Sequence, residues 1–456
     1  MALHQAAGYI SEQRLTFTSY ITEYEAEAAS LLDWFESHII PYERPDMLAP
    51  RPVLITWKTS FDKLDPDTRR WLIVFAHFAP DPIPEFLLDS APDANDEVKI
   101  RHRAAKRALS QAAKYSLLTR DDDPPRFKLH RLVQQILRLT APEEERANAL
   151  TMGIQLFVES KLGDPQDFRS WCKWTPLQQH AIAICSQYEN DTSPADFSWL
   201  LSELGLLLKS KSLYLEAEHC YRLALEIDEK RCGENHSSVA IRLNNLSMLL
   251  NVTNRLEEAE SFIRRALQID ESLYGPNHPT VGHRLNNLSQ VLVNANKLDE
   301  AEAPLRRSLQ IHEEALGPVH GDVARVQNNL ANLLRLTKRH EEAVSLLQNA
   351  IHTAEDYFGE NHPKVAMSLN NLAVVFQAIG KPEEAKPLLC RALNIFEVTY
   401  GSDHTDTAYA LFNLAVLIEA TGVLAEAEPL MRRAFGIFAC SLELEHPNTR
   451  GVGNHY

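Results

Sequence analysis

Paired asparagines recur through the second half of the chain, and an amide side chain can both donate and accept hydrogen bonds. The second asparagine of each pair falls at Asn245, Asn287, Asn329, Asn371 and Asn413. The first falls at Asn244, Asn286, Asn328 and Asn370, and Phe412 replaces it in the last full unit. Asparagine is a mediocre helix former, so its return to one helical position predicts a specific role. A row of amides can hold an extended peptide with little regard to its side chains.

Histidines recur with the same period of 42 residues and raise the question of a metal site. They are His236, His278, His320, His362, His404 and His446. One repeat corresponds to about 10 Å, the packing distance of neighbouring helix layers, whereas the ligands of a zinc ion lie about 2 Å from it. We therefore expect these histidines to act as linkers or caps, and we expect no metal site in the chain.

Motifs of zinc-protease and nucleotide chemistry are incomplete. HEEAL at 312 and HEEAV at 340 lack the second histidine of HExxH, because Leu316 and Val344 stand in its place. No GxxxxGK[ST] phosphate-binding loop occurs, since the Gly380–Lys381 pair has no glycine five residues earlier. We therefore expect no enzymatic activity and no cofactor in this chain.

Helical hairpins are expected to position the asparagines. Each unit has two segments with apolar residues at helical spacing, for example 239–252 and 256–273. Glycine follows the second segment, as at Gly275, where a left-handed turn would end the helix. Because one hairpin cannot bury its apolar stripe alone, the units should stack into a solenoid whose concave face is lined by the first helices.

This pattern resembles the tetratricopeptide repeat (TPR), with Leu-x-Asn-Leu-Gly/Ala in the first helix and two alanines in the second. The 42-residue length, the doubled asparagine and the Gly-x-x-His-Pro linker resemble the kinesin-light-chain type. The resemblance covers about residues 197–456, from a divergent first unit with Glu203 at the asparagine position to a last unit that stops inside its first helix.

The resemblance implies a set of groove residues, because the second asparagine of a TPR points into the groove and holds a ligand's backbone or terminal carboxylate. Arg325 stands where carboxylate-binding TPRs carry a basic residue. The implied ligand-binding set is Asn245, Asn287, Asn329, Asn371, Asn413, Arg325 and Asn332. For the first asparagine of each pair, a bond to the neighbouring hairpin is an open alternative.

The front third predicts helices followed by a small β-hairpin. Asp65 or Asp67 should cap an apolar helix, and a charged helix should run from about Asp96 to Lys114. YSLLTRDDDPPRFKLH reads as strand, turn and strand, and RLVQQILRLT as a further helix. This arrangement indicates a winged helix, and residues 141–196 read as two or three more helices.

Motifs in residues 1–140, including APDPIPE and FKLHRLVQQILR, resemble the region behind the nucleotide-binding core of STAND signalling ATPases of the NB-ARC kind. Bacterial members of that family often carry kinesin-light-chain-type TPRs. A Met-His-Asp motif in the family places its histidine on the β-phosphate of ADP, and here the motif reads Leu129-His130-Arg131. The resemblance implies a nucleotide contact for His130 only with a nucleotide core present, and we expect this chain to lack that core because it has no GxxxxGK[ST] loop.

Composition narrows the partners and the compartment. The net charge of −16 argues against nucleic acid or an anionic membrane as the main partner. Residues 98–138 hold 11 Lys and Arg and could contact phosphates, but the acidic turn Asp121–Asp123 would face a DNA backbone with the wrong sign.

Scattered cysteines indicate a reducing compartment. No apolar run approaches about 20 residues and no signal peptide is evident, so we expect a cytoplasmic protein.

We therefore predict a mainly α protein: a helical segment over 1–45, a winged-helix domain over 46–140, a helical linker over 141–196, and an α-solenoid of about six 42-residue TPR hairpins over 197–456. Its predicted function is the sensor portion of a STAND-type signalling protein, which recognises a peptide or protein in the TPR groove and relays binding to the winged helix. A stand-alone TPR scaffold and a winged-helix DNA-binding regulator are the alternatives.

Overall fold

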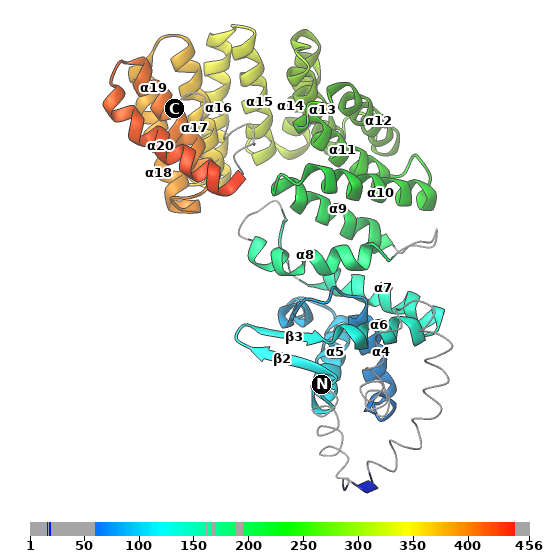
Figure 1. Cartoon of the computed structure of the whole chain (residues 1–456). Helices are drawn as coiled ribbons and strands as arrows, with labels where there is room; N and C mark the ends of the chain where they lie inside the picture. The colour runs from blue at the N-terminus through cyan, green and yellow to red at the C-terminus, as the bar shows by residue number, and fades with distance from the viewer. Residues whose placement is uncertain are drawn as a thin grey trace. The chain divides into compact units, whose positions relative to one another are not determined.

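The computed structural model describes residues 16, 18–19, 60–160, 162–165, 170–187 and 195–442. By packing, the chain divides into two compact units, Met1–Leu207 and Leu208–Tyr456. The described part is mainly helical, as predicted (Figure 1). The helical segment predicted over 1–45 lies almost wholly outside the described residues. The last predicted repeat, which stops inside its first helix, lies entirely outside them. Within the described part, no helix has the length and apolar character needed to cross a membrane.

In the first unit, several helices pack on one another beside a small antiparallel sheet. Its elements are α4 (Pro66–Ala76), β1 (Ile83–Pro84), the 3-10 helix η2 (Glu85–Leu88), α5 (Asp96–Lys114), β2 (Leu118–Asp122), β3 (Pro125–Leu129), α6 (Arg131–Thr140), α7 (Glu143–Glu159) and α8 (Trp171–Cys185). The strand order is β1-β3-β2. The charged helix, the β-hairpin and the helix after it are confirmed. β1 was not predicted, because two residues carry no readable periodicity.

Side chains fix both ends of α4. Asp65 is its N-cap and accepts a hydrogen bond from the Thr68 N–H at 2.9 Å, which decides between the two predicted caps. The buried Gln134 of α6 donates its amide to carbonyl oxygens at the end of α4, at 3.2 Å for Phe78. Since helix ends leave carbonyls without intrahelical partners, this contact joins α6 to α4.

Helix pairs follow one another through the rest of the chain (Figure 1). They are α9 (Ala195–Ser210) and α10 (Tyr214–Cys232), α11 (Ser237–Val252) and α12 (Leu256–Tyr274), α13 (Pro279–Asn294) and α14 (Leu298–Leu316), α15 (Gly321–Leu336) and α16 (His340–Phe358), α17 (Pro363–Ala378) and α18 (Pro382–Tyr400), and α19 (Thr405–Ala420) and α20 (Leu424–Leu442). Six pairs in the described part agree with the predicted number. The boundary between the two packing units falls inside α9, so a repeat array that starts at residue 197 stays a prediction.

The first helices form the inner side of the array. From α11 to α19, each first helix packs against the first helix of the next pair. The second helices of successive pairs pack less closely and are joined by surface ion pairs, such as the one between Arg306 and Glu342. The array therefore curves towards its first helices, as expected for a solenoid of helix hairpins.

The repeated histidines are helix caps. The Nδ1 atoms of the five described ones accept a hydrogen bond from the backbone N–H two residues later, at 3.1–3.2 Å. This confirms the predicted linker or cap role, while His446 lies outside the described residues. The glycine prediction needs a correction. Gly275 has φ 85° and ψ 162°, which is an extended conformation at positive φ that essentially only glycine adopts, rather than a left-handed helical turn.

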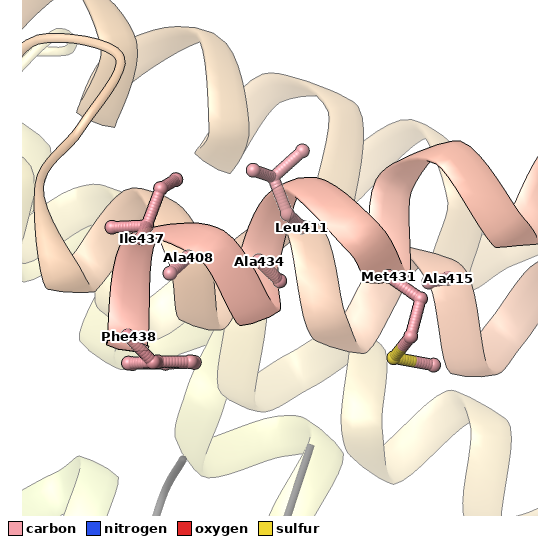
Figure 2. Close-up of a cluster of buried hydrophobic side chains, with 7 residues drawn as sticks. All are labelled: Ala408, Leu411, Ala415, Met431, Ala434, Ile437 and Phe438. Atoms are coloured by element: carbon pink, nitrogen blue, oxygen red, sulfur yellow. The ribbon is translucent and has the colours of Figure 1, made fainter. Parts of the chain in front are cut away.

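Small residues let the two helices of a pair approach closely. Ala259, Ala301, Ala343 and Ala385 have no exposed surface. Figure 2 shows the core of the last described pair, where Ala408, Leu411 and Ala415 of α19 lie with Met431, Ala434, Ile437 and Phe438 of α20. Each pair thus carries its own apolar layer and shares the remainder with its neighbours.

We expect Leu288→Ala to destabilise the array, because Leu288 lies in the core of α13 with 2% of its surface exposed. The loss of unfolding free energy should be about 2–5 kcal/mol, as for other buried Leu-to-Ala changes. Urea unfolding followed by circular dichroism measures it. Val398→Ala is the control, because Val398 is 78% exposed in α18 and its truncation should have little effect. Equal losses in both variants would contradict the assigned core.

Candidate functional site: the asparagine ladder and its pocket

The paired asparagines form hydrogen bonds between successive first helices. Four of the five second asparagines donate an Nδ2 hydrogen to the Oδ1 of the first asparagine in the preceding repeat. The bonds are Asn287 to Asn244 at 2.8 Å, Asn329 to Asn286 at 2.8 Å, Asn371 to Asn328 at 3.0 Å and Asn413 to Asn370 at 2.9 Å. We call this set the asparagine ladder. The first asparagine therefore bonds to the neighbouring hairpin, which was one of the two alternatives.

The ladder continues within two of the pairs. Asn244 Nδ2 lies 3.4 Å from Asn245 Oδ1, and Asn286 Nδ2 lies 3.3 Å from Asn287 Oδ1. These contacts are longer than the typical 2.9–3.0 Å for an N–H···O bond, so they are the weaker links. Asn328 instead donates to Ala324 O and Ser368 Oγ, both at 2.8 Å, so the head-to-tail chain of amides ends there.

The ladder leaves hydrogen-bonding capacity for a ligand. An amide has two N–H donors and a carbonyl with two lone pairs, and each inter-helix bond uses one donor of the second asparagine. Asn287, Asn329 and Asn371 are half-buried. Their contact with a ligand stays a prediction, as it does for Asn245 and Asn413.

A pocket of about 220 Å³ opens beside the ladder. Its lining residues are Asn251, Ser289, Gln290, Val293, Asn294, Leu305, Asn329 and Asn332. Asn329 and Asn332 belong to the predicted groove set, whereas Asn251, Gln290 and Asn294 were missed. Asn294 Nδ2 donates to Asn251 Oδ1 at 2.9 Å. These two residues are 43 positions apart, the same separation as the ladder partners, and the 42-residue period gave no signal for the contact.

Arg325 is engaged inside the repeat array. Its Nη2 atom lies 3.0 Å from Asp322 Oδ1 and 2.7 Å from His283 Nδ1. Asn332 Oδ1 accepts a hydrogen bond from Arg335 Nη2 at 2.9 Å. A carboxylate arriving at Arg325 would therefore compete with Asp322.

Burial keeps the two histidines near Arg325 neutral. It lowers the pKa of His283 to about 4, with the positive charge of Arg325 as the next cause. Burial likewise lowers the pKa of His312, which has no exposed surface. For Asp322, burial alone would raise the pKa, but the hydrogen bond from Arg325 and the positive charge of Arg325 lower it overall.

His130 lies in the first unit, between β3 and α6. Its side chain is exposed, and its carbonyl oxygen accepts the Gln134 N–H at 3.0 Å. The position agrees with the strand-to-helix junction expected from the sequence. Its contact with a nucleotide stays a prediction.

Two family models match parts of the chain. The tetratricopeptide repeat model matches residues 196–272, 243–314 and 322–397. Residues 59–146 match a domain of unknown function (DUF7779). The helix pairs in the matched ranges are thus tetratricopeptide repeats, and from α11 to α18 they stack as a solenoid, as predicted.

A curated relative and two solved structures are similar to this chain. A nucleotide-binding leucine-rich repeat (NLR)-like protein from Hyaloscypha variabilis is 28% identical over 258 residues, which are 54% of this chain and 24% of that protein. The chain therefore spans about a quarter of that relative's length. BtubC from P. vanneervenii is 24% identical, with a TM-score of 0.40 over 51% of this chain and 90% of that one. A Signal Transduction ATPase with Numerous Domains (STAND) protein with a TPR sensor, from Pyrococcus horikoshii, is 15% identical, with a TM-score of 0.44 over 90% of this chain and 61% of that one.

We expect Asn286→Ala to weaken the ladder. Asn286 is 1% exposed and accepts the bond from Asn329, so its removal should cost about 1–3 kcal/mol of unfolding free energy. Asn332→Ala is the control, because Asn332 is exposed and bonds only within its own helix in the described residues. It should change stability by less than about 0.5 kcal/mol. If Asn286→Ala and Asn332→Ala unfolded at the same urea concentration, the ladder would not stabilise the stack of helix pairs.

We also expect the stability of the array to fall with acidification. The pKa of His283 is about 4 in the folded chain against 6.5 for an ordinary histidine, so between these values the unfolded chain binds a proton that the folded chain does not. Unfolding free energy should therefore decrease as the pH falls from about 6.5 to about 4. His283→Ile, which installs the residue found at Ile241 one repeat earlier, should remove part of this slope. Urea unfolding at pH 7 and at pH 4.5 measures this change in unfolding free energy. If the wild-type chain and the His283→Ile variant lost the same amount between the two pH values, His283 would not be the group responsible.

Proposed function

We propose that the repeat array recognises an extended peptide or protein segment along the face of its first helices. The observation that carries this proposal is the pocket beside the ladder, whose amide and hydroxyl side chains come from α11, α13 and α15. An extended peptide presents alternating N–H and C=O groups, and amides can bond to both. Leu305 and Val293 add an apolar wall for one side chain of the ligand.

Within this proposal, the ladder and the neighbouring amides have different tasks. The ladder asparagines hold the first helices in register through their mutual bonds. Gln290 and Asn332 lie outside the ladder and line the pocket, so they can bind a ligand without breaking contacts between hairpins. Each bond to an uncharged peptide group contributes about 0.5–1.5 kcal/mol.

We further propose that the chain serves as the sensor portion of a STAND-type signalling protein and has no catalytic role of its own. The NLR-like relative supports this, because it is similar to about half of this chain within a much longer protein. Ligand binding to the repeats would be relayed to the first unit, and His130 would contact the nucleotide held by the ATPase core of a parent protein. Adding the cognate peptide to such a parent protein should change its nucleotide exchange rate, and an unchanged rate would contradict the relay.

A peptide selection followed by matched substitutions tests the binding proposal. Peptides selected from a display library against the chain should bind the Gln290→Ala, Asn332→Ala double variant about tenfold more weakly, since two hydrogen bonds are lost. The control is Gln348→Ala with Asn349→Ala, which removes the same two side-chain types from the exposed surface of α16. Fluorescence anisotropy measures the affinities. Selected peptides that bind both double variants equally would place the binding site elsewhere.

A further inference from the structure

Three side chains from neighbouring helices meet at one point beside Arg325. His283 of α13, His312 of α14 and Asp322 of α15 each offer a ligand atom, and these atoms all lie within 4.8 Å of one another. We propose that they form a binding site for a divalent transition-metal ion such as Zn²⁺. Two histidines and a carboxylate are a ligand set that zinc takes in proteins, with a fourth position left open.

His312 has the geometry of a metal ligand already in place. Its Nδ1 atom donates to Ser308 O at 2.7 Å, because a carbonyl can only accept. This bond leaves the lone pair on Nε2, which is buried and has no hydrogen-bond partner. Metal-bound histidines usually donate their second N–H to a backbone carbonyl or carboxylate, which fixes the tautomer.

The backbone is shaped around this imidazole. A Cβ atom on Gly282 would lie 2.5 Å from His312 Cε1, so only glycine leaves room for the ring at that place. The rings of His283 and His312 lie 4.8 Å apart, centroid to centroid. Ligands of a tetrahedral zinc ion are about 3–3.5 Å from one another, so the half-buried His283 and Asp322 must move by about 1 Å to close the site.

Arg325 occupies the place of a cation in the present arrangement. Its guanidinium contacts both His283 Nδ1 and Asp322 Oδ1, the acceptors that a metal ion would use. The Arg325–Asp322 ion pair is about one-third exposed on each side chain, and exposed ion pairs contribute little stability. A divalent ion can therefore displace the guanidinium at small cost.

The earlier repeats have a different contact, a buried ion pair, at the position of His312. One and two repeats before His312 stand Asp270 and Asp228, which pair with Arg284 at 2.8 Å and with Arg242 at 2.9 Å. Val326 stands 42 residues after Arg284, so the repeat of His312 has a valine where the earlier repeats have the arginine. His312 thus stands at the aspartate's position but has no arginine opposite it, so its Nε2 atom needs another partner.

Titration with Co²⁺, which gives a visible absorption band in tetrahedral sites, tests the proposal on the whole chain. We expect one equivalent to bind, Zn²⁺ to displace it, and His283→Ile to weaken binding by about tenfold or more. Arg325→Met, which installs the residue of the next repeat at Met367, should tighten binding because it removes the competing cation. His352→Ala is the control, since His352 is exposed in α16 and lies outside the cluster.

The variants separate this site from adventitious binding. His312→Ala should also lose the band, and circular dichroism checks whether this variant folds. If His312→Ala unfolds, His283→Ile is the deciding variant, because the preceding repeat carries an isoleucine, Ile241, at the position of His283. An absent band would overturn the proposal. So would a band that His283→Ile leaves unchanged, since the metal would then be held by other histidines or cysteines. Peptide binding in the pocket neither supports nor contradicts the metal site.

Discussion

A single helix hairpin cannot bury its own apolar stripe, and this constraint governs the repeat array. The alanines between paired helices, such as Ala301 and Ala343, are fully buried because the helices must approach closely for neighbouring pairs to share a core. Stacking brings the first helices side by side and makes them the inner side of the array. It also places equivalent residues of successive repeats next to one another. The asparagine ladder and the pocket beside it exist only because similar units repeat this contact.

The asparagine ladder gives a polar reason for the same stacking. Apolar packing alone tolerates small shifts between hairpins, whereas a hydrogen bond near 2.8 Å between Asn287 and Asn244 has a definite geometry. We interpret the ladder as the element that fixes the register of the first helices and so the spacing of groups along the inner face. Gln290 and Asn332 are then held at defined positions in the lining of the pocket.

Much of this arrangement could be predicted from local patterns, and the rest could not. The helix pairs, the histidine caps and the buried alanines follow from periodicity, because each concerns residues within one unit or its linker. The ladder bonds join residues 43 positions apart, while the repeat is 42 residues long, so the period does not reveal which amides meet. The cluster of His283, His312 and Asp322 was not predicted for a different reason: each residue comes from a different helix, and no short motif contains two of them. β1 and the positive-φ extended glycines were missed because the first is too short to show periodicity and the second needs backbone geometry.

The central claim is that the ladder asparagines hold the hairpins together while the amides beside them bind the ligand. Nuclear magnetic resonance of the side-chain amides, with asparagine and glutamine labelled selectively, tests both halves at once. The claim predicts slow hydrogen exchange for the Nδ2 protons of Asn287 and Asn329 in the free chain, and on peptide addition larger shifts for Gln290 and Asn332 than for the ladder. Ladder amides that exchange as fast as the exposed Asn349 in α16, and that shift most when the peptide binds, would contradict it.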